Sequence, residues 1–245
     1  MTLMRKFLLA CMATAMAASS LFAAEPIDNS VRKYEIAVND FTALKVVEGV
    51  TVEYRASADS AGFARFTTTP EMASLLMFSN NKQTLEIQLS TDGINHTGLP
   101  LVTVYSRFLT KVENSGDSLV RVATVEPTPS FRARLIGNGQ ISIRNIDTNY
   151  LDASLETGNG VMAITGSAAK AKYSLIGTGS IQAEEVTAVD VKCSMLGTGY
   201  VQCAPTAELT VSGASSGKVY YKGSPKIKNR SIGVKVLAIE ENQPD

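Results

Sequence analysis

The sequence predicts an all-β protein: a parallel β-helix, or β-solenoid, with about 20 residues per coil and an irregular, strand-rich N-terminal part. The first observation is a repeat of 20 residues in the second half of the chain, typical of units that bury their apolar sides against one another. The second is an apolar–polar alternation within each repeat, and the third is a small-residue bend at a fixed place in it. Three apolar columns share the period: Leu135, Leu155, Leu175 and Met195; Ala133, Ala153, Tyr173 and Cys193; and Phe131, Leu151, Ala171, Val191 and Val211.

Each repeat is expected to hold two short strands. The odd positions of residues 191–195 are apolar and the even ones polar, and residues 171–175 follow the same rule. A period of two indicates a strand, whereas a helix needs apolar residues three and four apart. The alternation resumes after the bend, which predicts two further inward columns: Ile141, Val161, Ile181 and Val201; and Ile143, Ala163, Ala183 and Cys203.

The bends read Gly-Asn-Gly or Gly-Thr-Gly, at residues 137–139, 158–160, 177–179 and 197–199. Glycine suits a tight bend because it adopts positive φ without a Cβ clash. A repeat of this length is too short for a strand, a helix and two loops. It suffices for one coil whose strands pair in parallel with the next coil, ~4.7–4.9 Å away. The crossover rule leads us to expect right-handed coils.

The solenoid repeats are expected over residues 111–236. Val112 marks an earlier coil with slightly shifted spacing, while Val219 and Tyr221 mark a last coil that has lost two residues after its bend. Irregular terminal units are expected in a solenoid, because exposed ends and open edges must be blocked. Residues 237–245 are interpreted as a polar tail.

Residues 25–110 are expected to form the N-terminal part of the same elongated body, because no Pro- or Ser-rich linker separates the two halves. Strands are expected where apolar residues alternate, at residues 34–38, 50–54, 84–89 and 101–105. A short helix is expected within residues 70–78, where Met72, Leu75 and Leu76 share a face. We expect no separate catalytic domain in this region.

Residues 1–24 have the pattern of a secretory signal. Arg5 and Lys6 supply positive charge, and the apolar stretch at residues 7–18 has the length of a signal core and is too short to span a bilayer. The stretch before Cys11 is short for a lipoprotein signal, and both the cleavage position and lipidation stay open. We therefore expect an exported protein, periplasmic, extracellular or at the cell surface, without an integral membrane segment after signal removal.

The composition argues against two classes of partner and leaves the state of the cysteines open. The chain has 23 basic and 23 acidic residues, which disfavours nucleic acid or an anionic membrane as a partner. After signal removal two cysteines remain, Cys193 and Cys203, both at inward positions of one coil. They are either two buried thiols or a disulfide across the coil. Their spacing does not fit a metal site, and we expect no metal and no cofactor.

The residues offer no convincing catalytic group. His96 lies in a polar turn, where an exposed imidazole is the simpler interpretation, and the serines lack an activating base. Glycoside hydrolysis needs two carboxylates facing one cleft, whereas Asp152 and Glu156 have no acidic neighbour one coil away. The Gly-x-Gly bends lack the following helix that a phosphate site requires. We therefore expect a protein that is not an enzyme.

Polar residues form outward columns along the repeats. Ser154, Ser174 and Ser194 form one column, and Lys172 and Lys192 belong to the next. A solvated outer wall is the simple interpretation. A flat ladder of hydroxyl and amine groups is also a candidate binding face for a glycan or for another surface protein. A third outward column is expected to contain Ser142, Met162, Gln182 and Gln202.

Three segments carry a family resemblance: residues 41–46 (FTALKV), 109–116 (LTKVENSG) and 219–225 (VYYKGSP). With the Gly-Thr-Gly coils they resemble, over residues 38–235, the domain of unknown function described as "putative auto-transporter adhesin, head GIN domain". The resemblance implies a β-helical protein exported by bacteria of the Bacteroidetes group and others, with an adhesive role and no established catalytic residue. The acidic residue that members usually carry at the bend is lost here, which weakens the idea of a metal-binding ladder.

Three functional hypotheses follow. The first is an exported binding module that holds a surface glycan or protein on the serine and lysine columns. The second is a structural module of the cell envelope that packs against copies of itself or against an envelope complex. The third is a carbohydrate-active β-helix enzyme, which would need paired carboxylates in a cleft.

Overall fold

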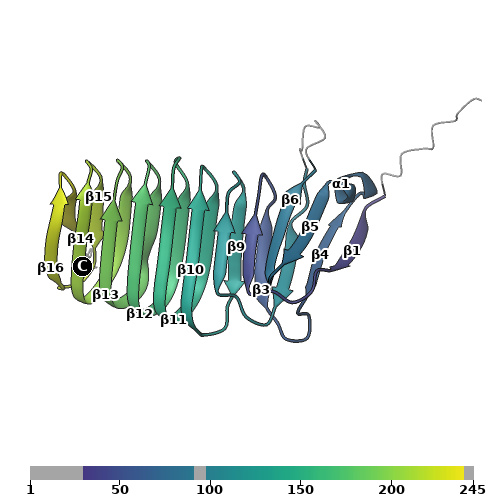
Figure 1. Ribbon diagram of the computed structural model, residues 1–245, viewed down its shortest axis with the longest axis horizontal. Helices are drawn as coiled ribbons and strands as arrows, with labels where there is room; N and C mark the ends of the chain where they lie inside the picture. Colours follow the sequence, from purple (N-terminus) through teal and green to yellow (C-terminus); the bar gives the residue numbers. More distant parts are fainter. Residues whose placement is uncertain (1–29, 91–97, 240–245) are drawn as a thin grey trace, which may run out of the picture.

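The computed structural model describes residues 30–90 and 98–239, so the signal segment, His96 and residues 240–245 of the expected tail lie outside the described residues. The described part is one sheet of 17 strands wound into a flattened solenoid, with a single helix of five residues (Figure 1). Leu155 pairs with Leu135 on one side and Leu175 on the other, which confirms the predicted coil of 20 residues.

The elements fall into an N-terminal group and a solenoid group. The N-terminal group comprises β1 Arg32–Ala37, β2 Ala43–Val46, β3 Val52–Ala56, β4 Phe63–Thr68, α1 Pro70–Ser74, β5 Leu76–Asn81, β6 Thr84–Leu89 and β7 Val102–Ser106. The solenoid group comprises β8 Lys111–Asn114, β9 Leu119–Thr124, β10 Thr128–Ile136, β11 Gln140–Glu156, β12 Val161–Ile176, β13 Ser180–Met195, β14 Tyr200–Ala214, β15 Lys218–Tyr221, β16 Lys226–Ile232 and β17 Lys235–Ala238.

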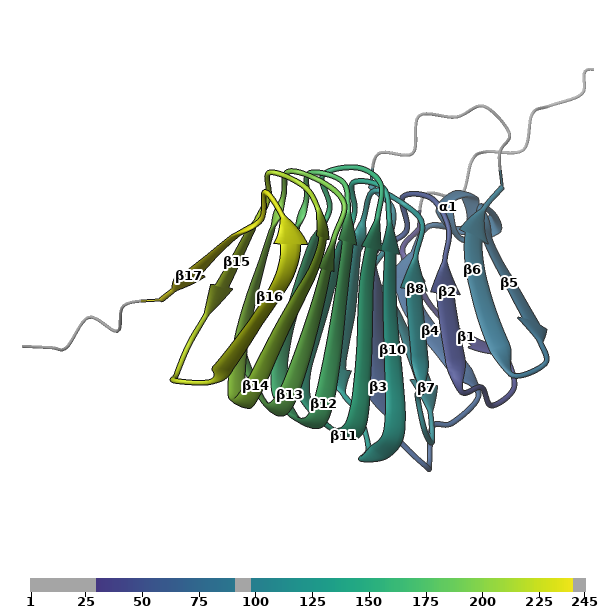
Figure 2. The ribbon, with the colours of Figure 1, turned by 60° about the vertical axis from the view of Figure 1, so that its left-hand side comes forward.

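Each coil contributes one strand segment to each of two walls. The front wall consists of β5, β6, β2, β8, β10, the C-terminal halves of β11 to β14, and β16. The back wall consists of β1, β4, β7, β3, β9, the N-terminal halves of β11 to β14, β15 and β17. Figure 2 shows the front wall, with β16 at one end and β5 at the other. The long strands β11 to β14 belong to both walls because each turns a corner midway, where the register shifts in all three pairings.

The N-terminal part is irregular, as predicted, because one coil is inserted between two others. β2 pairs with both β6 and β8, and β3 pairs with both β7 and β9, so the coil β2–β3 lies between the later coils. β4 and β5 join in antiparallel fashion, β4 to β1 and β7 and β5 to β6. The expected helix ends at Ser74, because Leu76 already begins β5; the prediction is wrong for the rest of residues 70–78.

The core is a stack of apolar side chains between the two walls. Leu135, Leu155, Leu175 and Met195 are all fully buried, as their column predicts. Each such side chain contributes roughly 1.5–3 kcal/mol through the hydrophobic effect. The stack includes large aromatic groups, among them Tyr54, Phe131 and Tyr173. The core therefore runs the length of the solenoid, as the repeat indicates.

Two predicted positions after the second bend are wrong by one residue. Met162 and Ile164 are buried and Met162 pairs with Ile141, whereas Val161 and Ala163 face outward. The cause is an additional residue, Thr157, which adopts a φ of 63° before the Gly-Asn-Gly bend. Met162 therefore does not join the outward glutamine column, where Ala163 pairs with Gln182 instead.

The coil formed by β14 is two residues shorter than the one before it. The sequence predicted this loss after the last bend, near Val219, but it occurs earlier, between Cys203 and Leu209. Ala183 pairs with Cys203, a spacing of 20 residues, but Val191 pairs with Leu209, a spacing of 18. Leu209 therefore continues the column that was predicted to end in Val211, and Val211 lies beneath Cys193. The two residues are lost at the corner of β14, where the register with β13 shifts.

The glycine bends stack directly on one another. A Cβ atom on Gly179 would lie 2.2 Å from the carbonyl oxygen of Gly160, and one on Gly199 would lie 2.0 Å from that of Gly179. The last residue of each bend must therefore lack a side chain because the backbone of the previous coil occupies its space. Positive φ accounts for the first glycine of three bends, at Gly137, Gly158 and Gly177.

Candidate binding face

The five residues singled out from the sequence lie together on the outer side of the front wall. Ser174 pairs with Ser154 on one neighbouring strand and Ser194 on the other, and Lys172 pairs with Lys192. The alternation of the strands turns these side chains outward because Tyr173 and Cys193, between them, are buried. The structure thus places the predicted residues on one face, and whether that face binds a ligand stays a prediction.

The serine row extends one coil farther than the sequence indicated, to Ser212, which pairs with Ser194. The 20-residue period missed this residue because the spacing has fallen to 18 at that point. Within the described chain, the hydroxyl groups of Ser154, Ser174 and Ser194 make no hydrogen bond, whereas Ser212 donates to the carbonyl oxygen of Cys193 at 3.3 Å. Three adjacent hydroxyl groups are therefore free to bond to a ligand.

The N-terminal side of the face is neutralised by ion pairs. The Arg134 guanidinium donates two hydrogen bonds to the Glu156 carboxylate, at 3.0 and 2.7 Å, and this pairing lowers the pKa of Glu156. Asp152 lies 3.5 Å from Arg132 and 3.9 Å from Lys172. These contacts leave little net charge on β10 and β11.

The C-terminal side of the face carries amines without an ion pair. Lys192 is exposed and makes no ion pair with any residue of the described ranges, and the same is true of Lys170. Because Lys172 and Lys192 are register partners in a parallel pair, their backbones are only ~4.7–4.9 Å apart. Over β12 and β13 this face therefore carries three lysines, Lys170, Lys172 and Lys192, against one acidic residue, Asp190, the register partner of Lys170.

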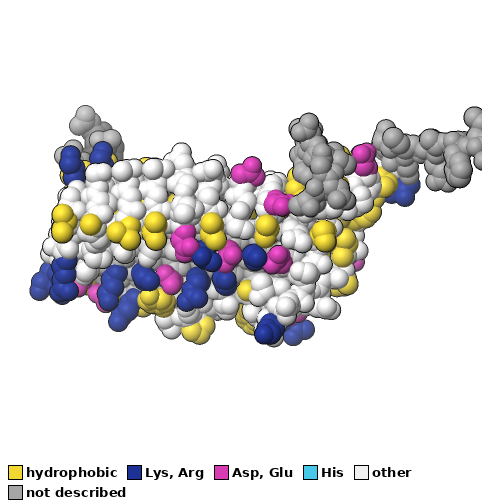
Figure 3. Space-filling model, turned by 45° about the horizontal axis from the view of Figure 1, so that its top comes forward, with side chains coloured by type: hydrophobic (Ala, Val, Ile, Leu, Met, Phe, Trp, Pro, Cys, Tyr) yellow, Lys and Arg dark blue, Asp and Glu magenta, His cyan; other side chains and the backbone are white. Residues whose placement is uncertain are grey.

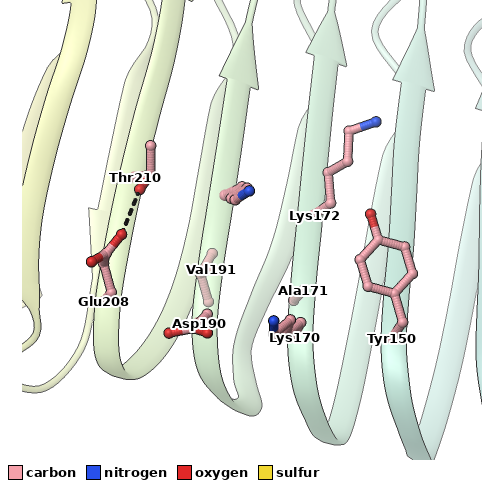
Figure 4. A pocket seen from close by; sticks show the side chains of 9 residues that line it. Tyr150, Lys170, Ala171, Lys172, Asp190, Val191, Glu208 and Thr210 are labelled. Carbon is pink, nitrogen blue, oxygen red and sulfur yellow. Dashed lines mark hydrogen bonds between the residues drawn. The ribbon is translucent and has the colours of Figure 1, made fainter.

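A hollow of ≈ 320 Å³ opens beside these lysines. Tyr150, Lys170 and Asp190 line its lower side and Lys172 its upper side, as Figure 4 shows. Its far side is formed by Glu208, which accepts a hydrogen bond from Thr210 at 3.1 Å. Sequence reasoning missed Tyr150 and Lys170 as site residues, although both stand one position from predicted inward residues and must therefore face outward.

Asp190 and Glu208 are register partners, so two carboxylates do lie side by side across one strand pair. The 20-residue period does not predict this pair, because the two residues are 18 positions apart. A hydrogen bond from Lys228 lowers the pKa of Glu208 and keeps its carboxyl group ionised. A general acid for glycoside hydrolysis needs the opposite shift.

An apolar ridge borders the serine row toward the bends. It comprises Ile176, Leu196, Ala214 and Ile232, of which Ile176, Leu196 and Ile232 are 44, 55 and 78% exposed. Figure 3 shows hydrophobic side chains in a row along the long axis of the molecule. The ridge places exposed apolar side chains on neighbouring coils along one edge of the front wall.

The two cysteines are buried and free, which matches one of the two states left open by the sequence. A hydrogen bond with Cys203, together with burial, raises the pKa of Cys193 well above its ordinary value. A protonated, buried thiol is a poor nucleophile. The described residues contain no group of three or more His, Cys, Asp or Glu side chains that could hold a metal ion.

No helix in the described ranges is long and apolar enough to cross a membrane.

The chain matches a family model described as "Putative auto-transporter adhesin, head GIN domain" over residues 40–225. No curated protein matches it significantly. Among solved structures, it is similar to a "putative adhesin" from Bacteroides fragilis, with a TM-score of 0.78, 18% identity, and coverage of 87% of this chain and 99% of that one. A "putative lipid binding protein" from Parabacteroides distasonis has a TM-score of 0.69 at 18% identity, covering 87% and 98%. A "putative adhesin" from Parabacteroides merdae has a TM-score of 0.65 at 21% identity, covering 86% and 96%. At these identities the likeness concerns the fold.

Proposed function

This chain belongs to the family described as "Putative auto-transporter adhesin, head GIN domain", and we propose that it is an exported, non-catalytic binding module that holds an acidic surface glycan on its front wall. The proposed site combines the serine row, Lys172 and Lys192, and the hollow beside Tyr150. The observation that carries the proposal is the placement of two lysines on adjacent strands with no acidic group between them.

The lysine pair favours an anionic ligand. Favourable cross-strand pairs each contribute roughly 0.2–1 kcal/mol to the stability of a sheet. Like charges directly opposite each other destabilise it by a similar amount. Asp152 pairs with Arg132 and Lys172 but not with Lys192, which makes no ion pair in the described chain. A carboxylate or sulfate placed between the two amines would replace this repulsion with two charge-assisted hydrogen bonds.

The surrounding groups favour a sugar as the carrier of that anion. The free hydroxyl groups of Ser174 and Ser194 can bond to sugar hydroxyl groups, and the half-exposed ring of Tyr150 offers an apolar surface to a sugar ring. The rows run along the solenoid axis, so an extended polymer would meet a serine on each of four coils and a lysine on two of them. This arrangement supports a glycan chain over a single small molecule.

The electrostatics of the carboxylates support a role without catalysis. Glu156 and Glu208 are both held ionised by basic partners, which lower their pKa values. Glycosidases require one carboxyl group whose pKa is raised so that it can donate a proton to the leaving group. Neither residue meets that requirement.

Export is supported by the N-terminal sequence. Arg5 and Lys6 precede an apolar stretch of signal length, at residues 7–18. The adhesin description of the family agrees with a location at the cell surface or in the periplasm. Expression of the full chain followed by fractionation and N-terminal sequencing would test export and locate the cleavage site.

Titration calorimetry with polygalacturonate and with its methyl ester would test the ligand class. We expect the acid polymer to bind and the neutral ester to bind at least about tenfold more weakly, because it cannot pair with the lysines. Lys192→Gln should weaken binding of the acid form, while Lys82→Gln, at the opposite end of the molecule, should not. Equal affinity for acid and ester would overturn the acidic-ligand assignment, and no binding to any acidic or neutral glycan on an array would overturn the glycan function itself.

The apolar ridge supports a second candidate, a self-assembling envelope module. Ile176 and Leu196 expose apolar surface in adjacent coils, and two copies could bury their ridges against each other. Light scattering would show a dimer that dissociates in Leu196→Ser. A strict monomer at all concentrations would rule this candidate out.

A further inference from the structure

The C-terminal end of the solenoid is an open sheet edge. Within the described residues, β16 pairs only with β14 and β17 only with β15, so each has one side without a neighbouring strand. Figures 1 and 2 place β16 at the extreme end of the front wall. The outer N–H and C=O groups of such an edge are a template on which another strand can pair.

This end of the molecule is also its most basic part. Residues 209–239 contain six Lys or Arg residues and no Asp or Glu, although the whole chain is neutral, and the acidic residues Glu208, Glu240 and Glu241 flank this stretch in the sequence. Lys226, Lys228 and Arg230 alternate along β16 and therefore project from one face of it. Lys228 is paired with Glu208, while Lys226 and Arg230 make no ion pair in the part of the chain that the structure describes. Figure 3 shows basic side chains gathered at this end.

The same edge leaves apolar side chains uncovered. Ile227 continues the inner column below Leu209, yet it is 40% exposed, whereas Leu209 is fully buried. Leu237 on β17 is also 40% exposed. One more strand laid on β16 would cover the inner column at this end, as each coil does for the coil before it.

A second copy of this chain does not supply that strand. Two β16 edges placed side by side would set their rows of cations against each other, which costs free energy. The edges at the opposite end do not offer an acidic row either: β5 (LMFSNN) has no charge, and β1 (RKYEIA) carries two basic residues and one acidic residue. None of the edge strands that the structure describes offers an acidic row, so charge complementarity favours a segment of a different chain.

We propose that β16 is a docking edge for an extended acidic segment of another protein, which adds to the front wall as a further strand. Its carboxylates at every second position would face Lys226, Lys228 and Arg230, and the apolar residues between them would cover Ile227. Backbone hydrogen bonds would supply affinity, and the alternating side chains would supply specificity. The docking edge adjoins the glycan face on the front wall, because Ser212 of the serine row pairs with Arg230 and Glu208 of the hollow pairs with Lys226.

Fluorescence anisotropy with labelled peptides would test the proposal on the mature chain. The probes are a peptide that alternates Val with Glu, its counterpart that alternates Val with Lys, and the Glu peptide with N-methylated backbone on one edge. We expect binding of the Glu peptide, none of the Lys peptide, and a loss of about tenfold or more on N-methylation, because strand pairing needs the N–H groups. Equal binding of the N-methylated peptide would overturn strand addition and leave only charge attraction.

Variants would locate the contact. The double variant Lys226→Glu, Arg230→Glu should abolish binding of the Glu peptide, whereas Lys82→Glu at the other end of the solenoid should leave it unchanged. A chain that ends at Ile239 should still bind, because the contact is made by β16. Equal losses at Lys82, or loss of binding in the shortened chain, would overturn the assignment. Circular dichroism of each variant would confirm that the solenoid is still folded.

Discussion

The hydroxyl group of Tyr173 lies inside the apolar stack with no hydrogen-bond partner among the described residues, and burial raises its pKa well above the ordinary value. Tyr54 is buried as well, but its hydroxyl group lies 3.0 Å from the hydroxyl oxygen of Ser106. Its hydroxyl group also donates to the carbonyl oxygen of Ser106 at 3.4 Å, so the two buried tyrosines differ in whether the hydroxyl group is hydrogen-bonded. They therefore form a matched pair for measuring what an unpaired polar group costs.

Tyr173→Phe should raise the free energy of unfolding by about 1 kcal/mol, because it removes a buried polar group that has no partner. Tyr54→Phe should lower it by about the same amount, because it removes the buried hydrogen bonds between the tyrosine hydroxyl group and Ser106. Urea denaturation followed by circular dichroism would measure both. A loss of stability in Tyr173→Phe would show that the hydroxyl group does have a partner.

The stacked bends make a second prediction at the scale of single residues. Gly179→Ala should lower the free energy of unfolding by several kcal/mol, since its Cβ would lie 2.2 Å from the Gly160 carbonyl oxygen and the backbone of the coil below would have to move. Gly49→Ala is the control, because its Cβ would meet only the end of the Asp117 side chain, at 3.3 Å. Equal losses in the two variants would contradict the stacking of the bends.

Lys192, which is proposed to bind the glycan, should lower the stability of the ligand-free protein, because it lies opposite Lys172 on the neighbouring strand. Lys192→Gln should raise the midpoint of thermal unfolding slightly, by the equivalent of ~0.2–1 kcal/mol, because it removes a like-charge neighbour of Lys172. The gain should shrink at high salt, where the repulsion is screened. Calorimetry at low and high salt would measure it, and a destabilised variant would remove the electrostatic argument for an anionic ligand.

The Arg134–Glu156 pair makes stability depend on pH. Its hydrogen bonds lower the pKa of Glu156, so the stabilisation is present above the unfolded-state pKa near 4.5 and is lost as pH falls through the folded-state value. The effect should be small, because the two side chains are 37 and 35% exposed and water screens them. Denaturation in Glu156→Gln should show a weaker fall in stability below about pH 4.5 than the unchanged chain. Glu126→Gln, at an exposed residue without an ion pair in the described chain, should behave like the unchanged chain.

At the scale of elements, the sequence predicted the strands where its period is strict and failed where the period changes. The columns through Leu155 and Ala153 are correct because alternation and period agree there. Val161 was misplaced because Thr157 adds one residue, and nothing in the alternation of Val-Met-Ala-Ile tells inward from outward. The pair Asp190–Glu208 was missed because the coil shortens at a corner, and corners carry no apolar period. The inserted coil β2–β3 could not be predicted, since pairing between distant strands leaves no local pattern.

At the scale of the whole molecule, each coil contacts chiefly the coil before and the coil after it. In such an architecture stability is close to a sum of units and interfaces. Deleting residues 172–191, one period, should therefore leave a folded, shorter solenoid with somewhat lower stability, because Ala171 would be followed by Lys192 in an equivalent position. Deleting residues 172–181, half a period, should prevent folding, because it exchanges the two walls. Circular dichroism and thermal unfolding would distinguish the two, and a folded half-period variant would contradict the coil register.

The stacked glycine bends tolerate little substitution, because an added Cβ atom would meet the backbone of the previous coil. The choice of residue is restricted at the bends and in the inner columns, because each of these residues contacts the backbone or the core of the adjacent coil. An outward residue such as Ser174 or Lys192 has only its two flanking neighbours to satisfy. The front wall is thus a regular surface on which outward residues can be substituted one at a time while the strands keep their register. The chemistry of the outer face can therefore change by single substitutions that the glycine bends could not accept.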